Sequence, residues 1–231
     1  MIEQGEIISY LQMCAEEGVN LQRGMNFRLK GGASVILMST RSGAPYSDRT
    51  EANGKILIYE GHDVPTSHEH QNPKTIDQPE RYTGGSLTQN GKFYKAAMAH
   101  KQEGALPEQV RVYEKIRNGI WVYNGLFNLV DAWQEHRDER NVFRFKLELI
   151  EEPASNAETK QHELVHTRLI PTHIKLEVWT RDRGKCVVCG SENNLHFDHI
   201  IPYSKGGSSI MAENIQLLCA RHNLAKHDRI E

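Results

Sequence analysis

The chain has 231 residues, of which 38% are hydrophobic and 25% are charged, and its formal net charge is −2. This composition excludes a disordered tail, and no segment approaches the ~18 consecutive apolar residues that a membrane-spanning helix needs. Residues 1–18 are acidic and lack a basic stretch, so we expect no secretory signal, a cytoplasmic protein and no membrane partner. Four cysteines in that compartment argue against a disulfide framework.

Hydrophobic patterns predict an α+β protein of two domains. Helices are predicted over residues 3–17, 93–102 and 107–118, and strands over 33–39, 55–60, 119–129 and 142–150. An acidic, polar stretch then reads as a linker. After it we expect a helix over 174–180, strands around 185–188 and 195–201, and a final helix that starts at about residue 212 or 219. The predicted division is a domain over 1–150, a linker over 151–166 and a domain over 167–231.

Four residues near the carboxy-terminal end have the spacing of metal ligands. Cys186 and Cys189 form a C-x2-C pair, and Cys219 and His222 form a C-x2-H pair further along the chain. Four such ligands are what a closed tetrahedral zinc site requires. We therefore expect a structural Zn²⁺, with buried metal-free cysteines or a redox pair as the alternatives.

The segment between and after these pairs carries a second pattern. It reads His196-Phe197-Asp198-His199-Ile200-Ile201-Pro202, then Ser204-Lys205-Gly206-Gly207, then Asn214, and finally His222-Asn223-x2-Lys226-His227. In order and spacing it resembles the HNH, or ββα-metal, nuclease family from about Ile174 to Arg229. The resemblance implies a small, zinc-stapled ββα-metal domain that hydrolyses phosphodiester bonds with a divalent ion.

The strand and the helix of this pattern suggest separate roles for their residues. Neighbouring strand residues point to opposite faces, so Asp198 and His199 cannot both hold one ion without distortion. Asp198 would bind Mg²⁺ or Mn²⁺, and His199 would take a proton from the attacking water. Asn223 and His227 are four residues apart on a helix and share one face. By resemblance Asn223 is the second metal ligand, and His227 matches a ligand found in some branches of the family.

Two further residues of the pattern complete the expected catalytic site. Lys226 could neutralise the charge of the scissile phosphate. Asn214 corresponds to the central Asn of the family, which by resemblance orients the loop around the general base.

Aromatic residues in the amino-terminal half suggest a binding slot. A strand over 34–39 is followed by a turn with Tyr46 and Asp48, and then by a strand that ends in Tyr59 and Glu60. Two tyrosines with a carboxylate between them in sequence could hold a flat heterocycle, with Asp48 accepting a hydrogen bond from an exocyclic amine. The alternative is that these tyrosines pack in the core, as strand tyrosines usually do.

The segments Ser34–Asp48, Ile56–Asp63, Thr88–Asn90 and the run from Val110 to Leu149 resemble the SRA (SET and RING-associated) family, which flips a modified cytosine out of duplex DNA. The resemblance implies an SRA-like twisted β-barrel with flanking helices. Tyr46 and Tyr59 would sandwich the base, and Asp48 would read its N4 amine. Glu60 stands where better-known members have a small Thr, so it could set the preference among methyl, hydroxymethyl and glucosylated cytosine.

Together the two resemblances imply a modification-dependent restriction endonuclease that acts on double-stranded DNA with modified cytosine. One active site cuts one strand, so cutting a duplex needs two copies or two successive nicks, and we expect a homodimer. Two alternatives stay open. The first is an HNH nicking or mobile-element endonuclease without modification dependence. The second is a non-catalytic DNA-binding module.

Overall fold

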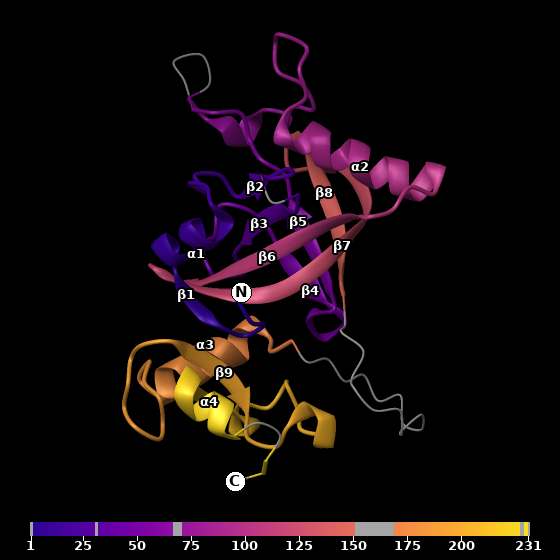
Figure 1. Cartoon of the computed structure of the whole chain (residues 1–231). Coiled ribbons are helices and arrows are strands. Elements are labelled where there is room, and N and C mark those ends of the chain that lie inside the picture. The colour runs from indigo at the N-terminus through magenta and orange to yellow at the C-terminus, as the bar shows by residue number, and fades with distance from the viewer. Residues whose placement is uncertain (1, 31, 67–70, 151–168, 227–228, 231) are drawn as a thin grey trace.

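A computed structural model describes residues 2–30, 32–66, 71–150, 169–226 and 229–230. In these residues the amino-terminal half (2–150) is built on one eight-stranded sheet, and the carboxy-terminal half (169–230) on a two-stranded hairpin with helices (Figure 1). The α+β class expected from the sequence is confirmed. No helix in the described segments is long and apolar enough to cross a membrane.

The helices and strands follow one another along the chain with short connections. In the amino-terminal half they are β1 (Ile7–Ser9), α1 (Tyr10–Glu17), β2 (Met25–Asn26), β3 (Ser34–Met38), β4 (Arg49–Glu51), η1 (Ala52–Gly54), β5 (Ile56–Glu60), η2 (Pro73–Thr75), α2 (Gln89–Glu103), β6 (Glu108–Arg117), β7 (Ile120–Arg137) and β8 (Arg140–Leu149). In the carboxy-terminal half they are α3 (Thr172–Arg181), β9 (Leu195–His199), η3 (Tyr203–Lys205), η4 (Ala212–Asn214), β10 (Ile215–Cys219) and α4 (Ala220–Lys226).

The large sheet is organised around three long strands. Its order is β2-β3-β6-β7-β8-β5-β4, and β1 pairs separately with β7. β3 and β6 are parallel, while β6, β7 and β8 form an antiparallel meander whose register shifts at Val112/Tyr113 and Leu129/Asp131. Such bulges increase the local bend and twist of a strand. The path begins at β2 and ends at β4, so the expected barrel is open between these two strands in the described part of the chain.

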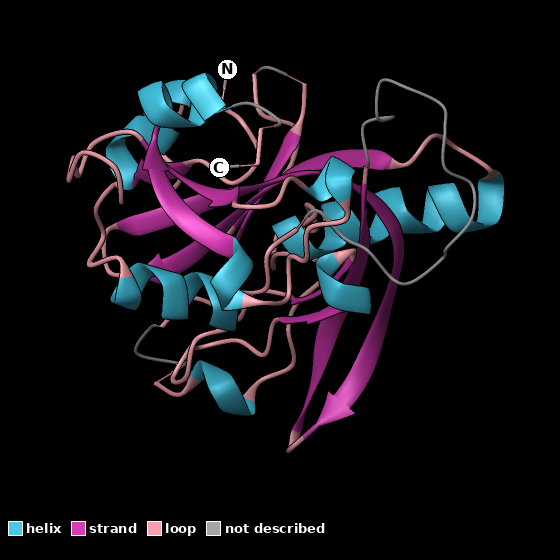
Figure 2. Ribbon diagram, turned by 90° about the horizontal axis from the view of Figure 1, so that it is seen from below, coloured by secondary structure: helices cyan, strands magenta, loops and turns pink. Residues whose placement is uncertain are grey.

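The main core of the amino-terminal half lies between α2 and the sheet (Figure 2). Phe93 and Ala97 of α2 are fully buried, and the Phe93 ring meets that of Phe145 edge-on at a centroid distance of 6.0 Å. Thr88 caps the start of the helix, because its side chain accepts a hydrogen bond from the Gly91 N–H. Burying one phenylalanine side chain contributes about 1.5–3 kcal/mol, so this face holds the helix in place.

The two halves share a second core beneath the meander. Ile116 of β6 and Val122 of β7 pack with apolar side chains of α3, β9 and β10 from the carboxy-terminal half, namely Ile174, Val178, Phe197, Ile215 and Leu217. Leu169, which the sequence assigns to the second domain, packs instead in the core of the first. The carboxy-terminal half is therefore docked on the sheet, as Figure 1 shows below β1 and β6.

A buried ion pair lies inside this shared surface. Lys175 of α3 contacts the Glu114 carboxylate of β6 at 2.8 Å and the Asn124 side-chain oxygen at 2.6 Å. Lys175 and Glu114 are each 1% exposed. Thr172 donates a hydrogen bond to Glu114 and lies 2.9 Å, Oγ1 to Oγ1, from Thr40. Each buried charge is thus paired and hydrogen-bonded, as burial requires.

The amino-terminal segment joins both sheets. The Gly5 N–H donates to the Tyr123 carbonyl at 2.9 Å, and the Tyr123 N–H donates to the Glu6 carbonyl at 3.0 Å. On the other side the Phe197 N–H donates to the Gly5 carbonyl at 3.2 Å, and Glu6 forms a β-bridge with His196. Residues 5–9 therefore form a seam between β7 and β9.

Three predicted elements were wrong. Residues 107–118 form strand β6 and not a helix, and residues 3–17 begin with strand β1 before α1. Residues 185–188 form a turn, and the partner of β9 is β10, so the final helix starts at Ala220. The other predicted elements are confirmed, with shifted ends. The linker predicted over 151–166 lies outside the described residues.

Candidate functional sites

The four predicted zinc ligands come together in space. Their ligand atoms all lie within 4.8 Å of one another. Cys189 Sγ lies 3.8 Å from Cys219 Sγ, and His222 Nδ1 lies 3.4 Å from Cys186 Sγ and 3.3 Å from Cys219 Sγ. Zinc bond lengths of about 2.3 Å to sulfur and about 2.0–2.1 Å to nitrogen give tetrahedral edges of about 3.8 Å and about 3.6 Å. The cluster therefore has the size that a Zn²⁺ ion needs.

The environment of Cys186 favours the thiolate form that metals bind. Burial raises the pKa of Cys186, but backbone N–H groups of Cys219, Cys189 and Val188 and the His222 side chain lower it to about 6. The segment that carries Cys186 and Cys189 is closed by a turn, because the Gly190 N–H donates to the Cys186 carbonyl at 2.8 Å. Leu195 and Leu218 pack around Cys186 and shield it.

Asp198 and His199 stand at the end of β9, opposite β10. The Asp198 Oδ2 atom accepts a hydrogen bond from Gln216 Nε2 at 3.2 Å and pairs with Lys226 Nζ at 2.9 Å. Lys226 Nζ also donates to the His199 carbonyl at 2.6 Å, and the Lys226 side chain is 1% exposed. Lys226 therefore ties Asp198 to the β9 backbone, and its expected contact with a substrate phosphate stays a prediction.

The loop after β9 is held by Asn214. Its side-chain oxygen accepts from the Ile201 N–H at 2.8 Å, and its Nδ2 donates to the carbonyls of Ile201 at 3.2 Å and Ser208 at 3.1 Å. Gly207 is required here, because a Cβ atom would lie 1.8 Å from the Ile201 carbonyl oxygen. Asn214 thus ties both ends of this loop together, and its role in orienting the general base stays a prediction.

A serine that the sequence analysis did not single out orients the His199 ring. His199 Nε2 lies 2.8 Å from Ser209 Oγ, and Ser209 is 4% exposed. A buried hydroxyl at this distance restricts the rotation of the imidazole. No local pattern distinguishes Ser209 from its neighbour Ser208, so sequence alone could not have selected it.

The predicted metal ligands of the helix are placed only in part. Asn223 is half-buried on α4, which packs against β9 and β10, and its role as a metal ligand beside Asp198 stays a prediction. His227 lies outside the described residues. An Asp carboxylate and an Asn amide oxygen are suitable ligands for Mg²⁺.

In the amino-terminal half, a cavity of about 660 Å³ is lined by Tyr46, Asp48 and Tyr59. This volume lies within the range of small-molecule binding sites. Tyr59 is 1% exposed and Tyr46 is half-buried. Burial raises the pKa of both phenols, so both stay neutral at physiological pH. Three of the four residues predicted to bind the base thus share one cavity.

Asp48 is fixed by backbone groups on both sides. Its Oδ2 accepts from the Ser39 N–H at 3.0 Å and its Oδ1 from the Glu60 N–H at 3.1 Å. Burial raises the pKa of Asp48 to about 7, although these two N–H groups act in the opposite direction. The carboxyl therefore changes charge near physiological pH.

Glu60, predicted as a base-binding residue, does not line this cavity. Its carboxylate lies among three arginines, 3.4 Å from Arg137, 3.4 Å from Arg140 and 3.2 Å from Arg144, and its side chain is 4% exposed. It also accepts from the Ser47 N–H at 3.0 Å. In the described residues Glu60 thus supports the turn that carries Tyr46 and Asp48.

His62 is a cavity residue that the sequence analysis missed. Its ring stacks on Tyr46 with centroids 5.7 Å apart, and its Nε2 lies 3.2 Å from the Tyr59 hydroxyl. Burial lowers the pKa of His62 to about 4, so the ring is neutral. Lys74 Nζ lies 4.1 Å from the Tyr46 ring centroid. The position of His62, three residues after Tyr59, was the only available signal.

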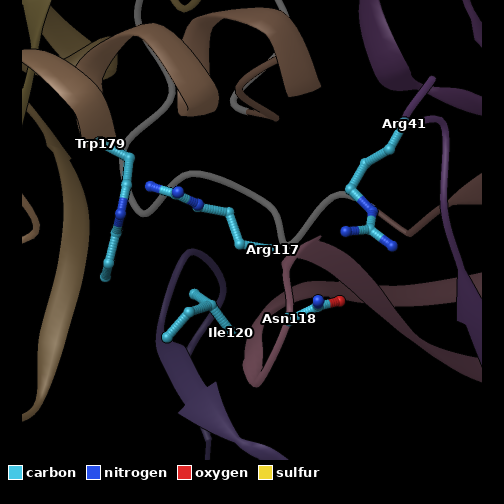
Figure 3. A pocket seen from close by; sticks show the side chains of 5 residues that line it. All are labelled: Arg41, Arg117, Asn118, Ile120 and Trp179. Carbon is cyan, nitrogen blue, oxygen red and sulfur yellow. The ribbon is translucent and has the colours of Figure 1, made fainter.

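A second cavity lies where the two halves meet. It measures about 450 Å³ and is lined by Arg41, Arg117, Asn118, Ile120 and Trp179 (Figure 3). Arg41 also lines the larger cavity, so one side chain borders both.

Comparisons with known proteins agree with this division of the chain. Residues 2–152 match the SAD/SRA domain model, and residues 186–229 match the HNH endonuclease model. No curated protein matches the chain.

SRA domains are among the solved structures that are similar to this chain. The SUVH5 SRA domain in complex with hemi-methylated CG DNA is 24% identical, covers 64% of this chain and 89% of its own, and has a TM-score of 0.46. The same domain bound to fully hydroxymethylated CG DNA is 22% identical, with coverages of 64% and 89% and a TM-score of 0.44. Arabidopsis thaliana SUVH6 in complex with SAM is 20% identical, covers 64% of this chain and 25% of its own, and has a TM-score of 0.39.

The SAD/SRA match extends over well more than half of the 231 residues. The chain therefore belongs to the SAD/SRA domain family, joined in one polypeptide to a segment that matches the HNH endonuclease family.

Proposed function

We propose that this protein is a DNA endonuclease whose cutting depends on a modified cytosine. The observation that carries the proposal is the shared cavity of Tyr46, Asp48 and Tyr59. The other half of the same chain carries Asp198 and His199 as consecutive residues at the end of β9. The family matches support both parts: one domain of a modified-DNA reader family, and one of a nuclease family.

The cavity would take a base that has left the DNA stack. Extruding a base costs a few kcal/mol, and stacking on aromatic rings returns about 1–3 kcal/mol per base. Tyr46 and Tyr59 would provide these rings, and Asp48 would accept a hydrogen bond from the N4 amine. Because both Asp48 oxygens are fixed by backbone N–H groups, the acceptor is in place before the base arrives. His62 contacts both tyrosines, so an entering base would meet it as well.

In the HNH half, His199 would take the proton from the water that attacks phosphorus. Ser209 fixes the orientation of the His199 ring, and Asn214 holds the following loop. Lys226 holds the Asp198 carboxylate and the His199 carbonyl in a fixed relation. A divalent ion such as Mg²⁺ or Mn²⁺, held by Asp198 and Asn223, would supply the stabilisation of charge on the phosphate and the leaving oxygen. His227 remains a predicted third ligand.

The Cys186, Cys189, Cys219 and His222 cluster would hold Zn²⁺ as a structural ion. It lies at the start of α4, so the ion would fix the helix that carries Asn223 relative to β9. In a half this small, metal binding can supply on the order of 10 kcal/mol of folding free energy.

Several finer points stay predictions. They are the domain limits 1–150 and 167–231, the cytoplasmic location, a role in restriction of foreign DNA, and a homodimer for cutting both strands. The preference among methyl, hydroxymethyl and glucosylated cytosine is a further open prediction, for which Glu60 would act through the turn it supports.

Cleavage of matched DNA tests the proposal. Identical duplexes bearing cytosine, 5-methylcytosine, 5-hydroxymethylcytosine or its glucosylated form are incubated with the protein in Mg²⁺ and in Mn²⁺. We expect cutting of at least one modified duplex and none of the unmodified one. His199→Ala should bind the preferred duplex as the unaltered protein does but cut it at least about 100-fold more slowly.

His136→Ala is the matched control, because His136 is exposed at the end of β7 and away from both cavities. It should cut at the normal rate. Equal cutting of modified and unmodified DNA would remove the reading function. Undiminished cutting by His199→Ala would remove the assigned base.

A further inference from the structure

The second cavity, which lies where the two halves meet, combines cationic side chains with walls from both halves of the chain. Arg117 and Asn118 come from the end of the β6–β7 hairpin, Arg41 from the loop after β3, and Trp179 from α3 (Figure 3). In Figure 3 the Arg117 side chain points toward Trp179, and Arg41 lies on the other side of the hairpin. The amino-terminal and carboxy-terminal halves thus both contribute to one basic hollow.

Within the part of the chain that the structure describes, neither arginine is neutralised by an acidic side chain. Arg41 Nε donates to the Ser39 hydroxyl at 3.2 Å, and neither Arg41 nor Arg117 forms an ion pair with a carboxylate of the described residues. Arg117 is exposed and Arg41 is half-buried. By contrast, Arg140 and Arg144, also in this half, pair with carboxylates. The charge of Arg41 and Arg117 is therefore available to an external anion.

The walls of the hollow are held rigidly. Thr40, next to Arg41, lies 2.9 Å from Thr172 at the start of α3, and Thr172 in turn donates to Glu114. Trp179 is backed by Gly184, where a Cβ atom would lie 2.7 Å from the indole ring. The backbone beside Arg41 is thus tied to α3 of the carboxy-terminal half.

The hollow shares one lining residue with the cavity of Tyr46, Asp48 and Tyr59. Arg41 lines both, and Lys115 and Gly119 of the same hairpin region line the base cavity. Arg23 is a further cation of that cavity. Cationic side chains thus line both cavities, although the whole chain carries a net charge of −2.

We propose that the hollow of Arg41, Arg117, Asn118 and Trp179 is a binding site for DNA backbone phosphate, which holds the strand between the flipped nucleotide and the nuclease half. This inference rests on the proposed function. Planar guanidinium groups donate paired hydrogen bonds to phosphate oxygens, and the Asn118 amide can donate another. The indole of Trp179 offers a surface for a sugar or an unstacked base.

Binding measurements with Arg117→Ala test the site. Arg117 is exposed at the hairpin end, so its removal leaves the core intact. The probe is a duplex with one central 5-methylcytosine or 5-hydroxymethylcytosine, whichever the unaltered protein binds more tightly. Binding is measured in EDTA over a range of salt concentrations. We expect about tenfold weaker binding. The slope of log K against log salt should become shallower by about one unit.

The loss should be the same for unmodified DNA, because a phosphate contact carries no base information. Arg117→Lys should recover part of the affinity. Lys95→Ala is the matched control, since Lys95 is exposed on α2, at the end of the sheet away from the nuclease half (Figure 1). It should leave affinity and slope unchanged.

Phosphate ethylation gives a second readout that does not need cleavage. Ethylating a phosphate next to the modified cytosine should weaken binding of the unaltered protein, and Arg117→Ala should lose that sensitivity at one position. Unchanged affinity, slope and ethylation pattern in Arg117→Ala would overturn the phosphate site while leaving the proposed function standing. If the unaltered protein itself neither prefers nor cuts modified DNA, the proposed function fails, and this inference fails with it.

Discussion

The buried pair of Lys175 and Glu114 gives the sharpest prediction about how the two halves are held together. Both residues are 1% exposed, and their charged atoms are 2.8 Å apart. Removing one partner of such a pair leaves a buried charge without compensation, which costs about 3–5 kcal/mol. Lys175→Met should therefore lower the free energy of unfolding by about that amount and the Tm by on the order of 10 °C.

The pH dependence of this loss identifies its cause. Burial raises the pKa of Glu114, but Lys175, Thr172 and Asn124 together lower it below its ordinary value of 4.5. In the unaltered protein, ionised Glu114 thus contributes stability above that pH, and the contribution is lost as pH falls through the folded pKa. Without Lys175 burial dominates and the folded pKa rises. In this variant the folded state then holds the Glu114 proton to a higher pH than the unfolded chain, whose pKa stays near 4.5. The free energy of unfolding that Lys175→Met loses relative to the unaltered protein should therefore increase as pH rises above 4.5.

Urea titrations at about pH 5 and about pH 8 measure both effects. Tryptophan fluorescence follows the two halves at once, because Trp179 lies in α3 while Trp121 and Trp133 lie in β7. Glu114→Gln combined with Lys175→Met removes both charges and should cost at least about 1 kcal/mol less than Lys175→Met alone.

The matched control is the exposed pair of Lys185 and Glu192, whose side chains are 49% and 66% exposed. Lys185→Met should cost less than about 1 kcal/mol. A loss in Lys175→Met that is equally small and independent of pH would refute the reasoning, because the pair would then not be a buried, charged contact.

Two further predictions concern the zinc cluster and the base cavity. Cys219→Ser should lower the zinc content, measured by metal analysis, from about one ion per chain to about none, and it should reduce thermal stability. Cys14→Ser, outside the cluster, should do neither. A Cys219→Ser protein with full zinc content and stability would contradict a structural ion. Because the pKa of Asp48 is raised to about 7, its ionised fraction should increase from about a tenth at pH 6 to about nine tenths at pH 8. The ratio of affinities for modified and unmodified DNA, measured without divalent ions, should then increase up to about ninefold over this range, and a flat ratio would show that Asp48 does not act as a carboxylate acceptor.

The sequence predicts the zinc ligands well, because their chemistry depends on residue types at short fixed spacings, whereas only strand β9 of the HNH hairpin was anticipated and its partner β10 was not. Cys186, Cys189, Cys219 and His222 come together as expected. The base cavity was also anticipated in part, since Tyr46, Asp48 and Tyr59 lie on a turn and a strand that follow closely in sequence. Ligands and pocket residues of this kind are encoded locally.

Strand β6 shows why other elements were missed. Its residues Glu108, Gln109, Arg111 and Lys115 favour helices in isolation. Burial alternates at Val110, Val112, Glu114 and Ile116, and the partner on one side is the distant strand β3. Tertiary pairing overrides local propensity here, and a buried Glu is not an obvious core residue without its partner Lys175.

Lys226 illustrates the same limit for a functional residue. Its place in the Asn-x2-Lys pattern was recognised, but burial against Asp198 and the His199 carbonyl depends on how α4 packs on β9. Likewise Ser209 and His62 act through contacts with residues that sequence analysis had already selected. Such supporting roles depend on geometry that spacing alone does not carry.

The seam of residues 5–9 affects any attempt to exchange one half for another. Gly5 and Glu6 pair with the edge of β9 in the nuclease hairpin, although they belong to the opposite end of the polypeptide. A chimaera designed by cutting within the acidic stretch would therefore graft a hairpin without its edge partner, and would leave the Phe197 N–H without its acceptor. A transplantable nuclease half must bring this short leading segment with it, so the recombination unit of the protein is not contiguous in sequence.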